Sequence, residues 1–515
     1  MAGRPVADRD GGRVDGAPRS TWPGTVGGVG RVGQAGCGRP AAGVRAGVDI
    51  GVRSLRPAGR VPPVTTREHP WTSPTGLRGR PSVPPRGFRY GEPVTEPSHV
   101  LTPPVDVLVV GGGLAALRTV AALRDHGFDG PVRVLGAEGV APYDRPPLSK
   151  HLLDRTSPAW LADELGHDLH ALADEVHLDR PARGLRVRAG GGAVVVTDDG
   201  HLAASCVVLA TGAHATTVPG WRAATLHTAA DADGLRAALA GGRRRLVVVG
   251  AGWVGAEVAG VSAAAGHHVT VLESRAAPLA SALGESVGVM TTPWYAAAGV
   301  VLRTGATVTA VDGAGADGSV VTLDDGERLS ADAVLVAVGA RPATGWLGGA
   351  LPLRGDAVPV DEAYRVLGPD GPFPGLLAVG DVAVRRSARH GWVPGGHWDE
   401  ALHGPDVLVR HLLGVPVDGP EATPYVFSTQ LGHDLTMFGL PASDDAVTVL
   451  GDPAGDGWTT LWTRGDVVTG TLVVDRPRDV GAARRLFARD HLPHLVLPAG
   501  LPDDLRTLLR TSPAT

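Results

Sequence analysis

The first residues that could support chemistry form a glycine-rich turn, in which Gly111, Gly113 and Ala116 occupy the positions of the pattern G-x-G-x-x-G/A. The first glycine allows a tight turn, the second lets a pyrophosphate approach the backbone, and the third small residue lets a helix pack on the preceding strand. Free amides at the start of that helix attract phosphate. An acidic residue, Glu138, ends the next apolar run. The turn therefore predicts a dinucleotide-binding site.

The same pattern returns about 140 positions later with Gly250, Gly252 and Gly255, and Glu273 ends the apolar run that follows. A carboxylate at this place accepts a hydrogen bond from a ribose 2′-hydroxyl and repels a 2′-phosphate. The pattern favours NADH over NADPH, although Arg275 follows two residues on. One glycine pattern can be an ordinary helix-packing turn, but two complete copies favour two nucleotides. Two nucleotides that face each other can exchange a hydride between flavin and nicotinamide.

The elements that would hold these turns are strand–helix–strand units. An apolar run, a glycine turn and a helical pattern follow one another from Val105 and again from Arg245. Later runs of strand type that contain glycine, at 207–212, 334–339 and 375–383, supply closing strands. Short strands and an amphipathic helix come last. We predict an α/β fold with two Rossmann-like dinucleotide-binding domains and a C-terminal α/β domain.

The cationic side chains carry a second signal. Among 48 Lys and Arg residues only Lys150 is a lysine, and a lysine kept in an arginine-rich chain indicates a need for its compact ammonium. Residues 1–104 hold 15 Arg against 7 acidic residues, which leaves a net charge of −13 on the remainder. Those arginines are scattered among Gly and Pro, which argues against nucleic-acid binding and for a disordered extension. A start codon assigned too far upstream is our first explanation for it, and an unusual targeting extension is the alternative. No run approaches the roughly 18 apolar residues of a membrane helix, so we predict a cytoplasmic protein without membrane contact.

The cysteine content excludes several classes of flavoenzyme. Cys37 and Cys206 are the only two cysteines, and they form no C-x-x-C or C-x4-C pair. This argues against glutathione-, lipoamide- and thioredoxin-type reductases, which relay electrons through a thiol pair. Neither cysteine lies where the first helix could present it to a flavin, which argues against peroxidases and oxidases with one redox cysteine. The route that remains is outer-sphere electron transfer from the flavin.

Several runs together resemble one family. The runs APYDRPPLSK (141–150), AVGDVA, HWDEA (397–401) and VDRPRDVGAARRLF (474–487) are similar to those of FAD-dependent ferredoxin, rubredoxin and putidaredoxin reductases. These enzymes are relatives of apoptosis-inducing factor within the pyridine nucleotide-disulfide oxidoreductase superfamily. The resemblance covers the chain from about Val105 to its C-terminus.

The resemblance implies a hydride-transfer site. It places Arg145 and Lys150 along FAD, Asp381 at the ribityl chain or pyrophosphate, and Glu257 opposite Lys150 near the flavin N5 edge, where nicotinamide docks. An ammonium there stabilises the electron-rich reduced flavin, and a carboxylate orients it. Lys150 and Glu257 are therefore the predicted catalytic residues. The full FAD-binding set is Gly111, Gly113, Leu114, Ala115, Glu138, Arg145, Lys150, Ala182, Ala210, Thr211, Gly212, Gly380, Asp381, Trp398 and Phe427. The NAD-binding set is Gly250, Gly252, Trp253, Val254, Gly255, Glu257, Glu273 and Gly339.

The chain departs from the family pattern at a few places. Ala137 stands where the family has its first acidic residue after the second strand, so Glu138 is left as the acidic residue there. An arginine that is common in the family after the run ATG is replaced near Thr216. The run VFSTQ (426–430) stands where the family tends to carry FWSDQ, and ALHGP (401–405) where it carries A-x-x-Q-G. These departures concern FAD contacts and the face at which electrons leave.

We expect an NADH:ferredoxin oxidoreductase that passes single electrons from FAD to a ferredoxin-type iron-sulfur protein, which supplies a P450 or a Rieske oxygenase. Two alternatives stay open: an NADH oxidase or quinone reductase, and a redox sensor similar to apoptosis-inducing factor. The chain would act as a monomer or homodimer. The predicted domains are a disordered extension (1–104), a discontinuous FAD-binding domain (105–222 and 341–418), a NAD-binding domain (223–340) and a C-terminal reductase domain (419–515).

The charge of the chain body raises a docking problem. A body with a net charge of −13 would repel an acidic ferredoxin. We therefore expect a local arginine patch to dock the partner, and predict that it comprises Arg385, Arg386, Arg476 and Arg478.

Overall fold

A computed structural model describes residues 104–313 and 318–512. The extension predicted at 1–104 lies outside these residues, except for Pro104. The described residues belong to one compact unit, so the contacts between their parts can be discussed together.

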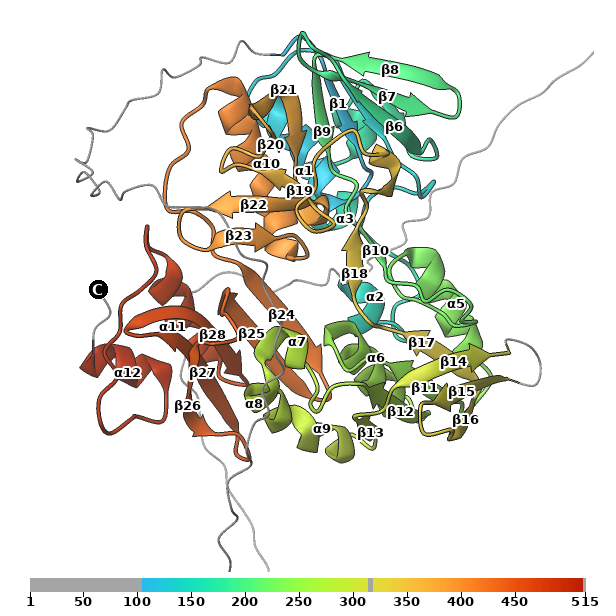
Figure 1. Cartoon of the computed structure of the whole chain (residues 1–515), viewed down its shortest axis with the longest axis vertical. Coiled ribbons are helices and arrows are strands. Elements are labelled where there is room, and N and C mark those ends of the chain that lie inside the picture. The colour runs from blue at the N-terminus through green and yellow to red at the C-terminus, as the bar shows by residue number, and fades with distance from the viewer. Residues whose placement is uncertain (1–103, 314–317, 513–515) are drawn as a thin grey trace, which may run out of the picture. The chain divides into compact units, whose positions relative to one another are not determined.

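The first glycine turn belongs to a nine-stranded sheet whose centre is parallel (Figure 1). All four residues of β1 (Val107–Val110) are buried, as is typical of a parallel strand covered on both faces. The helix α1 (Leu114–Asp125) follows the turn and packs against α10 (Trp398–Leu413). The sheet runs in the order β23 (Gly391–Pro394), β22 (Ala383–Ser387), β19 (Val358–Val360), β20 (Arg365–Gly368), β21 (Gly371–Ala378), β9 (Cys206–Leu209), β1, β2 (Val132–Leu135) and β5 (Glu175–His177).

The second glycine turn belongs to a separate parallel sheet of four strands. The turn joins β11 (Arg245–Val249) to α6 (Trp253–Ala264), and all residues of β11 except Arg245 are buried. The order of the strands is β13 (Val301–Thr304), β12 (His268–Glu273), β11 and β17 (Ala333–Val336). Each dinucleotide-type sheet is accompanied by a three-stranded antiparallel sheet: β6 (Ala182–Val187), β7 (Ala193–Thr197) and β8 (Gly200–Ala204) for the first, β14 (Val308–Asp312), β15 (Ser319–Leu323) and β16 (Arg328–Ala331) for the second.

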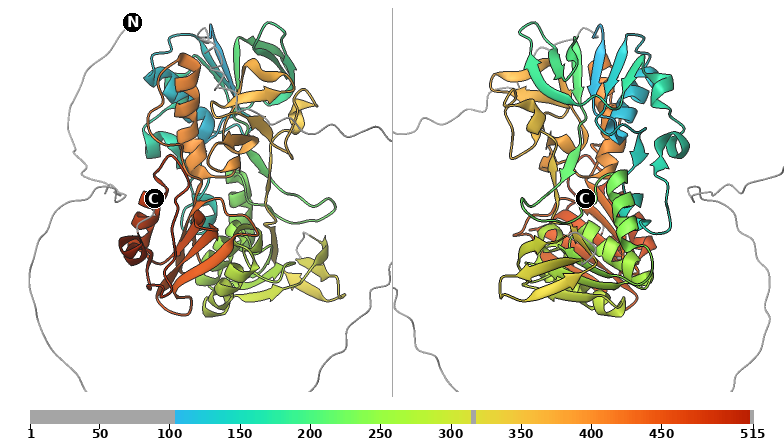
Figure 2. Two further views of the ribbon diagram at one scale, coloured as in Figure 1. Left: turned by 60° about the vertical axis from the view of Figure 1, so that its left-hand side comes forward. Right: turned by 90° about the vertical axis from the view of Figure 1, so that its right-hand side faces the viewer.

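The C-terminal part is a five-stranded antiparallel sheet that lies against α6, as the views in Figures 1 and 2 show. A Cβ at Gly260 of α6 would lie 2.8 Å from the backbone nitrogen of Leu431, so glycine is required for this close approach. Trp458 and Trp462 share one apolar core with Trp294 of the NAD-type part. The strands run in the order β24 (Tyr425–Gln430), β25 (His433–Gly439), β28 (Val467–Val474), β27 (Gly457–Arg464) and β26 (Ala446–Asp452), with helices α11 (Pro477–Phe487) and α12 (Leu505–Thr511) after them.

Two connections cross between the dinucleotide-type sheets. The strands β10 (Ala213–Ala215) and β18 (Ala340–Pro342) pair antiparallel where the chain leaves the first sheet and returns to it. The predicted α/β fold, with two Rossmann-like units and a C-terminal α/β domain, is confirmed, while the domain boundaries stay predictions. The remaining strands and α-helices are α5 (Ala229–Leu239) and the short elements β3 (Tyr143–Asp144), α2 (Pro147–Lys150), β4 (Ala159–Trp160), α3 (Leu161–Leu165), α4 (Leu169–Leu172), α7 (Ala280–Leu283), α8 (Glu285–Gly288) and α9 (Thr292–Ala297).

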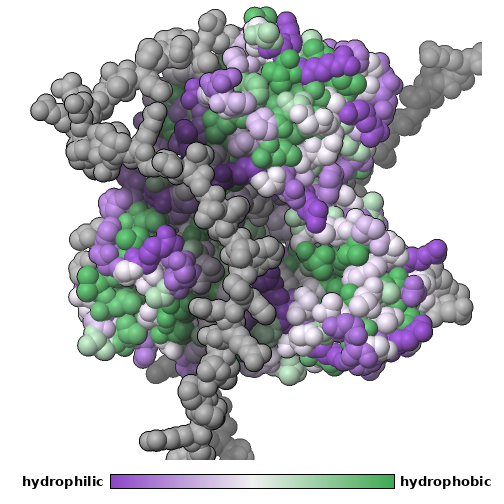
Figure 3. All heavy atoms as spheres, in the orientation of Figure 1, coloured by the Kyte–Doolittle hydropathy of each residue, from purple (hydrophilic) through white to green (hydrophobic). Residues whose placement is uncertain are grey.

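The surface of the described part mixes polar and apolar residues. Figure 3 shows hydrophilic and hydrophobic residues interspersed over the visible face. Within residues 104–313 and 318–512, none of the helices combines the length and the apolar character that a membrane span requires.

Candidate functional site

Both glycine turns open on one cavity of about 1410 Å³, which β24 of the C-terminal sheet also lines. Sites for single drug-sized molecules occupy about 300–1,000 Å³, so this cavity has room for more than one ligand of that size. Every residue of the two predicted binding sets lines it except Gly255. Gly255 instead lies at the helix–strand contact, where a Cβ would approach the Gly250 carbonyl oxygen to 2.1 Å. The two predicted binding sets, whose glycine turns are about 140 positions apart in the sequence, therefore line the same cavity.

Backbone geometry explains why the turns need glycine. Gly111 has φ +135° and Gly250 has φ +103°, a region that side chains disfavour. A Cβ at Gly111 would lie 2.0 Å from the Ala210 carbonyl oxygen, and one at Gly250 would lie 2.6 Å from that of Ala337. Beside Gly113 and Gly252, in contrast, a Cβ would meet no atom within 4 Å. Both turns therefore leave room for a pyrophosphate at the start of a helix.

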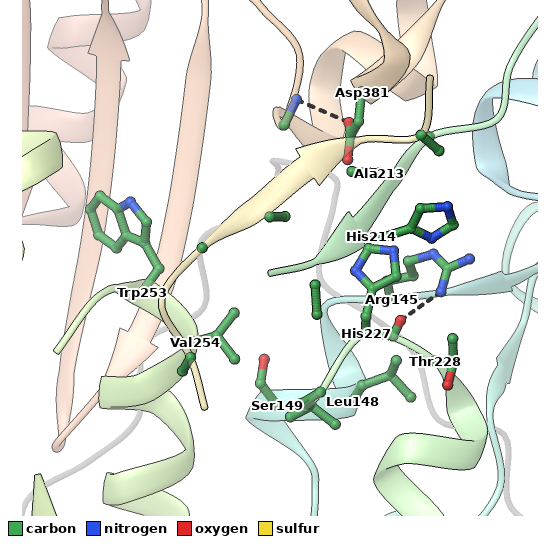
Figure 4. Close-up of a pocket in the computed structure, with 18 of the residues that line it drawn as sticks. Arg145, Leu148, Ser149, Ala213, His214, His227, Thr228, Trp253, Val254 and Asp381 are labelled. Carbon is green, nitrogen blue, oxygen red and sulfur yellow. Dashed lines mark hydrogen bonds between the residues drawn. The ribbon is translucent and has the colours of Figure 1, made fainter. Parts of the chain in front are cut away.

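A polar cluster surrounds Arg145 on the FAD-type side of the cavity. Its guanidinium pairs with Glu138 and donates to the Tyr143 hydroxyl (2.9 Å) and the His227 carbonyl oxygen (2.6 Å). Burial raises the pKa of Tyr143 to about 12. Burial and the adjacent Arg145 lower the pKa of His227 to about 4, so that its imidazole is neutral at pH 7. Figure 4 shows His227 and His214 beside Arg145.

Tyr143, His214 and His227 were not predicted as site residues. Tyr143 lies within the run APYDRPPLSK, so its position beside Arg145 was a usable signal. The two histidines come from segments that carry no motif, β10 and the stretch before α5.

Asp381 and Trp398 complete this side of the cavity. Asp381 accepts a hydrogen bond from the backbone nitrogen of Gly396 (3.0 Å), and burial raises the pKa of its carboxyl group. The indole nitrogen of Trp398 donates to Asp144 (2.7 Å), and its ring meets that of Phe427 edge to face at 6.1 Å. The two predicted aromatic residues therefore contact each other.

The predicted catalytic pair is in direct contact. The Lys150 ammonium lies 2.6 Å from Oε1 of Glu257, whose side chain is only 3% exposed. The same ammonium lies 5.1 Å from the centre of the Phe427 ring. Two serine hydroxyls, of Ser149 and Ser428, also donate to Glu257, each at 2.5 Å. The sequence analysis did not assign a role to the two serines, although Ser149 lies in the run APYDRPPLSK and Ser428 in the run VFSTQ, so both positions were usable signals.

On the NAD-type side, Glu273 lies at the end of β12 beside the second turn. Its two carboxylate oxygens accept hydrogen bonds from the backbone nitrogens of Ala251 and Arg275, both at 2.8 Å. These bonds hold the carboxylate at the edge of the cavity, where it can still accept from a ribose hydroxyl. Trp253 and Val254 at the start of α6 face the cavity opposite Arg145 (Figure 4). The residues present therefore fit FAD on one side and a nicotinamide nucleotide on the other.

The predicted arginine patch is wrong for Arg385. Arg385 is 4% exposed and its guanidinium forms ion pairs with Glu400 (2.9 Å) and Glu421 (2.5 Å), so it cannot meet a partner. Arg386 is exposed but paired with Glu362 (2.9 Å). Arg476 donates to the Asp503 carbonyl oxygen. Sequence position alone did not reveal that Arg385 and Arg386 would pair with acidic residues 15 to 36 positions away. Arg478 is exposed, as the predicted patch requires.

A different group of arginines lies on the C-terminal part. A groove of about 290 Å³ between α11 and α12 is lined by Ala482, Leu486 and Leu509 and by four arginines: Arg485, Arg489, Arg506 and Arg510. Arg485, Arg506 and Arg510 are exposed. We call this the arginine groove.

Comparison with known proteins covers most of the described chain. Residues 105–401 match the family model described as pyridine nucleotide-disulphide oxidoreductase, and residues 425–509 match that of the reductase C-terminal domain. The ferredoxin–NAD(+) reductase component of the anthranilate 1,2-dioxygenase system of Burkholderia cepacia is 33% identical over 405 residues, covering 75% of this chain and 95% of that protein. Rhodocoxin reductase of Rhodococcus erythropolis is 31% identical over 406 residues, covering 75% and 90%. The crystal structure of the covalent putidaredoxin reductase–putidaredoxin complex matches with 27% identity and a TM-score of 0.67, covering 76% of this chain and 94% of that one.

Proposed function

The chain belongs to the pyridine nucleotide-disulphide oxidoreductase family, and from this premise we propose that it is an FAD-dependent NADH:ferredoxin oxidoreductase. It takes electrons from NADH and passes them singly to a ferredoxin-type iron-sulfur protein that supplies a P450 or a Rieske oxygenase. The observation that carries the proposal is that both nucleotide turns open on one cavity, with the Lys150–Glu257 pair on its wall. The relatives named above are a ferredoxin–NAD(+) reductase component of a dioxygenase system, a rhodocoxin reductase and a putidaredoxin reductase, as their names state.

The proposal requires electrons to leave without a thiol. Cys206, the cysteine that the structure describes, is fully buried in β9, and burial raises the pKa of its thiol to about 12. A protonated, buried thiol is a poor relay. FAD itself can supply the required chemistry, because it accepts two electrons together and releases them one at a time.

The residues of the chain would then have separate tasks. The Lys150 ammonium places positive charge where negative charge accumulates on reduction, and Glu257 fixes its position. Arg145, Glu138 and Asp381 would hold the nucleotide and ribityl portions of FAD. Glu273 would accept from the ribose hydroxyl of NADH and disfavour the phosphate of NADPH. NADH is an intracellular reductant, which supports a cytoplasmic location.

The arginine groove is the surface we assign to the iron-sulfur partner, in place of the patch predicted from the sequence. Its exposed guanidinium groups stand on a body with a net charge of −13, so they offer an acidic protein a local attraction. The helix α11 also reaches the cavity wall, since Arg484 lies 6.0 Å from the ring centre of Tyr425, a lining residue. A partner that binds the arginine groove would therefore contact the helix whose neighbouring residue, Arg484, reaches the cavity wall.

The proposal is tested by anaerobic titration of the purified yellow protein with NADH, followed by addition of ferredoxin and cytochrome c in a stopped-flow spectrometer. Rapid bleaching with ferredoxin-dependent cytochrome reduction is the expected result. A protein that holds no flavin would overturn the proposal. Bleaching that ferredoxin does not relieve would favour an NADH oxidase or quinone reductase if oxygen or quinone restores the colour. It would favour a redox sensor if a long-wavelength absorption band persists.

A further inference from the structure

The carboxylate of Glu257 is the meeting point of three parts of the chain. Glu257 lies on α6 of the NAD-type part, Ser149 and Lys150 lie on α2 of the FAD-type part, and Ser428 lies on β24 of the C-terminal sheet. All three partners donate to this one carboxylate. The site is therefore incomplete without the C-terminal sheet.

The hydroxyl of Ser428 has a fixed direction. Gln430 donates its side-chain amide to the Ser428 oxygen (3.2 Å), so the hydroxyl proton of Ser428 is left to donate to Glu257. Ser428 and Gln430 are each 2% exposed, and hydrogen bonds are stronger where water is excluded. Pairing of Ser428 with Leu435 across β24 and β25 holds the backbone in place. Ser428 is thus a directed donor.

Ser428 and Lys150 share a single oxygen atom. Both donate to Oε1 of Glu257, while Ser149 donates to Oε2. A second donor on Oε1 disperses the negative charge that faces the ammonium, and leaves more of the positive field of Lys150 directed at the cavity. The adjacent residue of the same strand, Phe427, places its ring 5.1 Å from the same ammonium. Successive residues of β24 therefore hold both members of the pair.

We propose that Ser428 is a positioning residue for electron transfer from NADH to FAD, through which the C-terminal sheet sets the position and effective charge of Lys150. The proposal rests on the proposed function, but only on its first half, the reduction of bound FAD by NADH. Ser428 touches neither nucleotide in this account and acts through Glu257.

The test compares Ser428→Ala with the wild-type holoenzyme. Anaerobic stopped-flow reduction gives the limiting rate and the Kd for NADH, and a dye-equilibrium titration gives the midpoint potential of bound FAD. The variant should lower the limiting rate of FAD reduction about tenfold. The corresponding rise in the activation free energy is smaller than the full free energy of one hydrogen bond to a charged group. If the substitution destabilises reduced FAD, the midpoint potential becomes more negative by about 30 mV, which for a two-electron couple corresponds to a tenfold change in the equilibrium constant. The Kd for NADH should stay unchanged.

Three further variants make the result specific. Thr429→Ala removes the neighbouring hydroxyl, which is exposed and donates to Asp434 instead, and should change neither rate nor potential. Ser428→Thr keeps the donor and should recover the wild-type potential. Ser149→Ala removes the other hydroxyl from Glu257 and should shift rate and potential in the same direction, which gives a second test if Ser428→Ala folds poorly.

Several results would overturn the proposal. One is a Ser428→Ala enzyme whose rate per bound FAD and potential match those of Thr429→Ala. Another is a loss confined to FAD content or thermal stability, which would indicate a merely structural role. Failure of the wild type to reduce ferredoxin would overturn the partner assignment and leave this inference standing, whereas failure to hold FAD would overturn both.

Discussion

The most informative perturbation is the replacement of Lys150, the single lysine of the chain, by methionine. Methionine has similar length and no charge, so the variant leaves the Glu257 carboxylate buried without its counter-ion. Removing one partner of a buried ion pair costs about 3–5 kcal/mol of folding free energy. Glu257 is 3% exposed, but Ser149 and Ser428 still donate to it at 2.5 Å. We therefore expect the lower end, about 3 kcal/mol.

The assay is urea unfolding of protein freed of FAD, so that changes in cofactor binding do not enter the free energy of unfolding. The double variant with Glu257→Gln removes the uncompensated charge and should restore about 2 kcal/mol, a coupling energy that a double-mutant cycle isolates. The exposed Arg328→Met serves as a control for the loss of one positive charge and should have little effect. A cost below about 1 kcal/mol for Lys150→Met, or no recovery in the double variant, would refute the account of a charge-compensated cluster.

Three other outcomes follow from the site and its surroundings. Glu273→Gln keeps the size of the side chain but removes its charge, and should raise the ratio of kcat/KM for NADPH over NADH about tenfold; an unchanged ratio would place the ribose elsewhere. Reversing two charges of the arginine groove, with Arg485→Glu and Arg506→Glu, should raise the KM for an acidic ferredoxin about tenfold at low salt and leave NADH-driven FAD reduction intact. The control Arg328→Glu should change neither quantity. Equal KM values for the groove variant and the wild type would show that the partner does not bind at α11. His390 has its pKa lowered to about 4 by burial and by Arg389, so the folded state holds fewer protons on it than the unfolded state between pH 4 and 6.5. Stability should therefore fall as the pH drops through that window. Urea unfolding of His390→Phe should show a flatter pH dependence, and an identical slope would contradict the assignment.

The sequence predicted the parts of the fold that repeat a strict local pattern. Both strand–glycine–helix units and the closing strands appear where the periodicity placed them, because a buried parallel strand and a packed helix each need an apolar pattern of fixed period. The antiparallel sheets β6–β8 and β14–β16 were not predicted. The strands β7 and β15 alternate buried and half-buried residues over only five positions, and β6 and β16 each contain a single buried residue, which is too short a signal to separate from loops.

The residues of the candidate site likewise fall into those that the sequence predicted and those that it did not. Gly111 and Gly250 could be predicted because only glycine fits these turns, Lys150 stood out as the single lysine of the chain, and Glu257 was implied by the family resemblance. Their runs pointed to Ser149 and Ser428, but their bonds to Glu257 were not predicted, because these depend on the approach of α2 and β24 to α6 across 108 and 171 positions of sequence. The predicted arginine patch was wrong at Arg385 for a related reason. A count of charges does not show which arginines fold against carboxylates, as Arg385 does with Glu400 and Glu421.

The energetics of the buried pair argue that its purpose is chemical. Removing two charges from water costs several kcal/mol per ion, and a buried ion pair is often no more stable than apolar residues of the same volume. Stability therefore gives no reason to bury Lys150 and Glu257 at the junction of three parts of the chain. The pair is instead surrounded by donors that fix its geometry, and it lies on the wall of a cavity lined by both nucleotide turns. A fixed positive charge in a water-poor site needs no reorganisation when negative charge develops beside it. An exposed lysine on a flexible side chain would have to reorient, and so would not give this advantage.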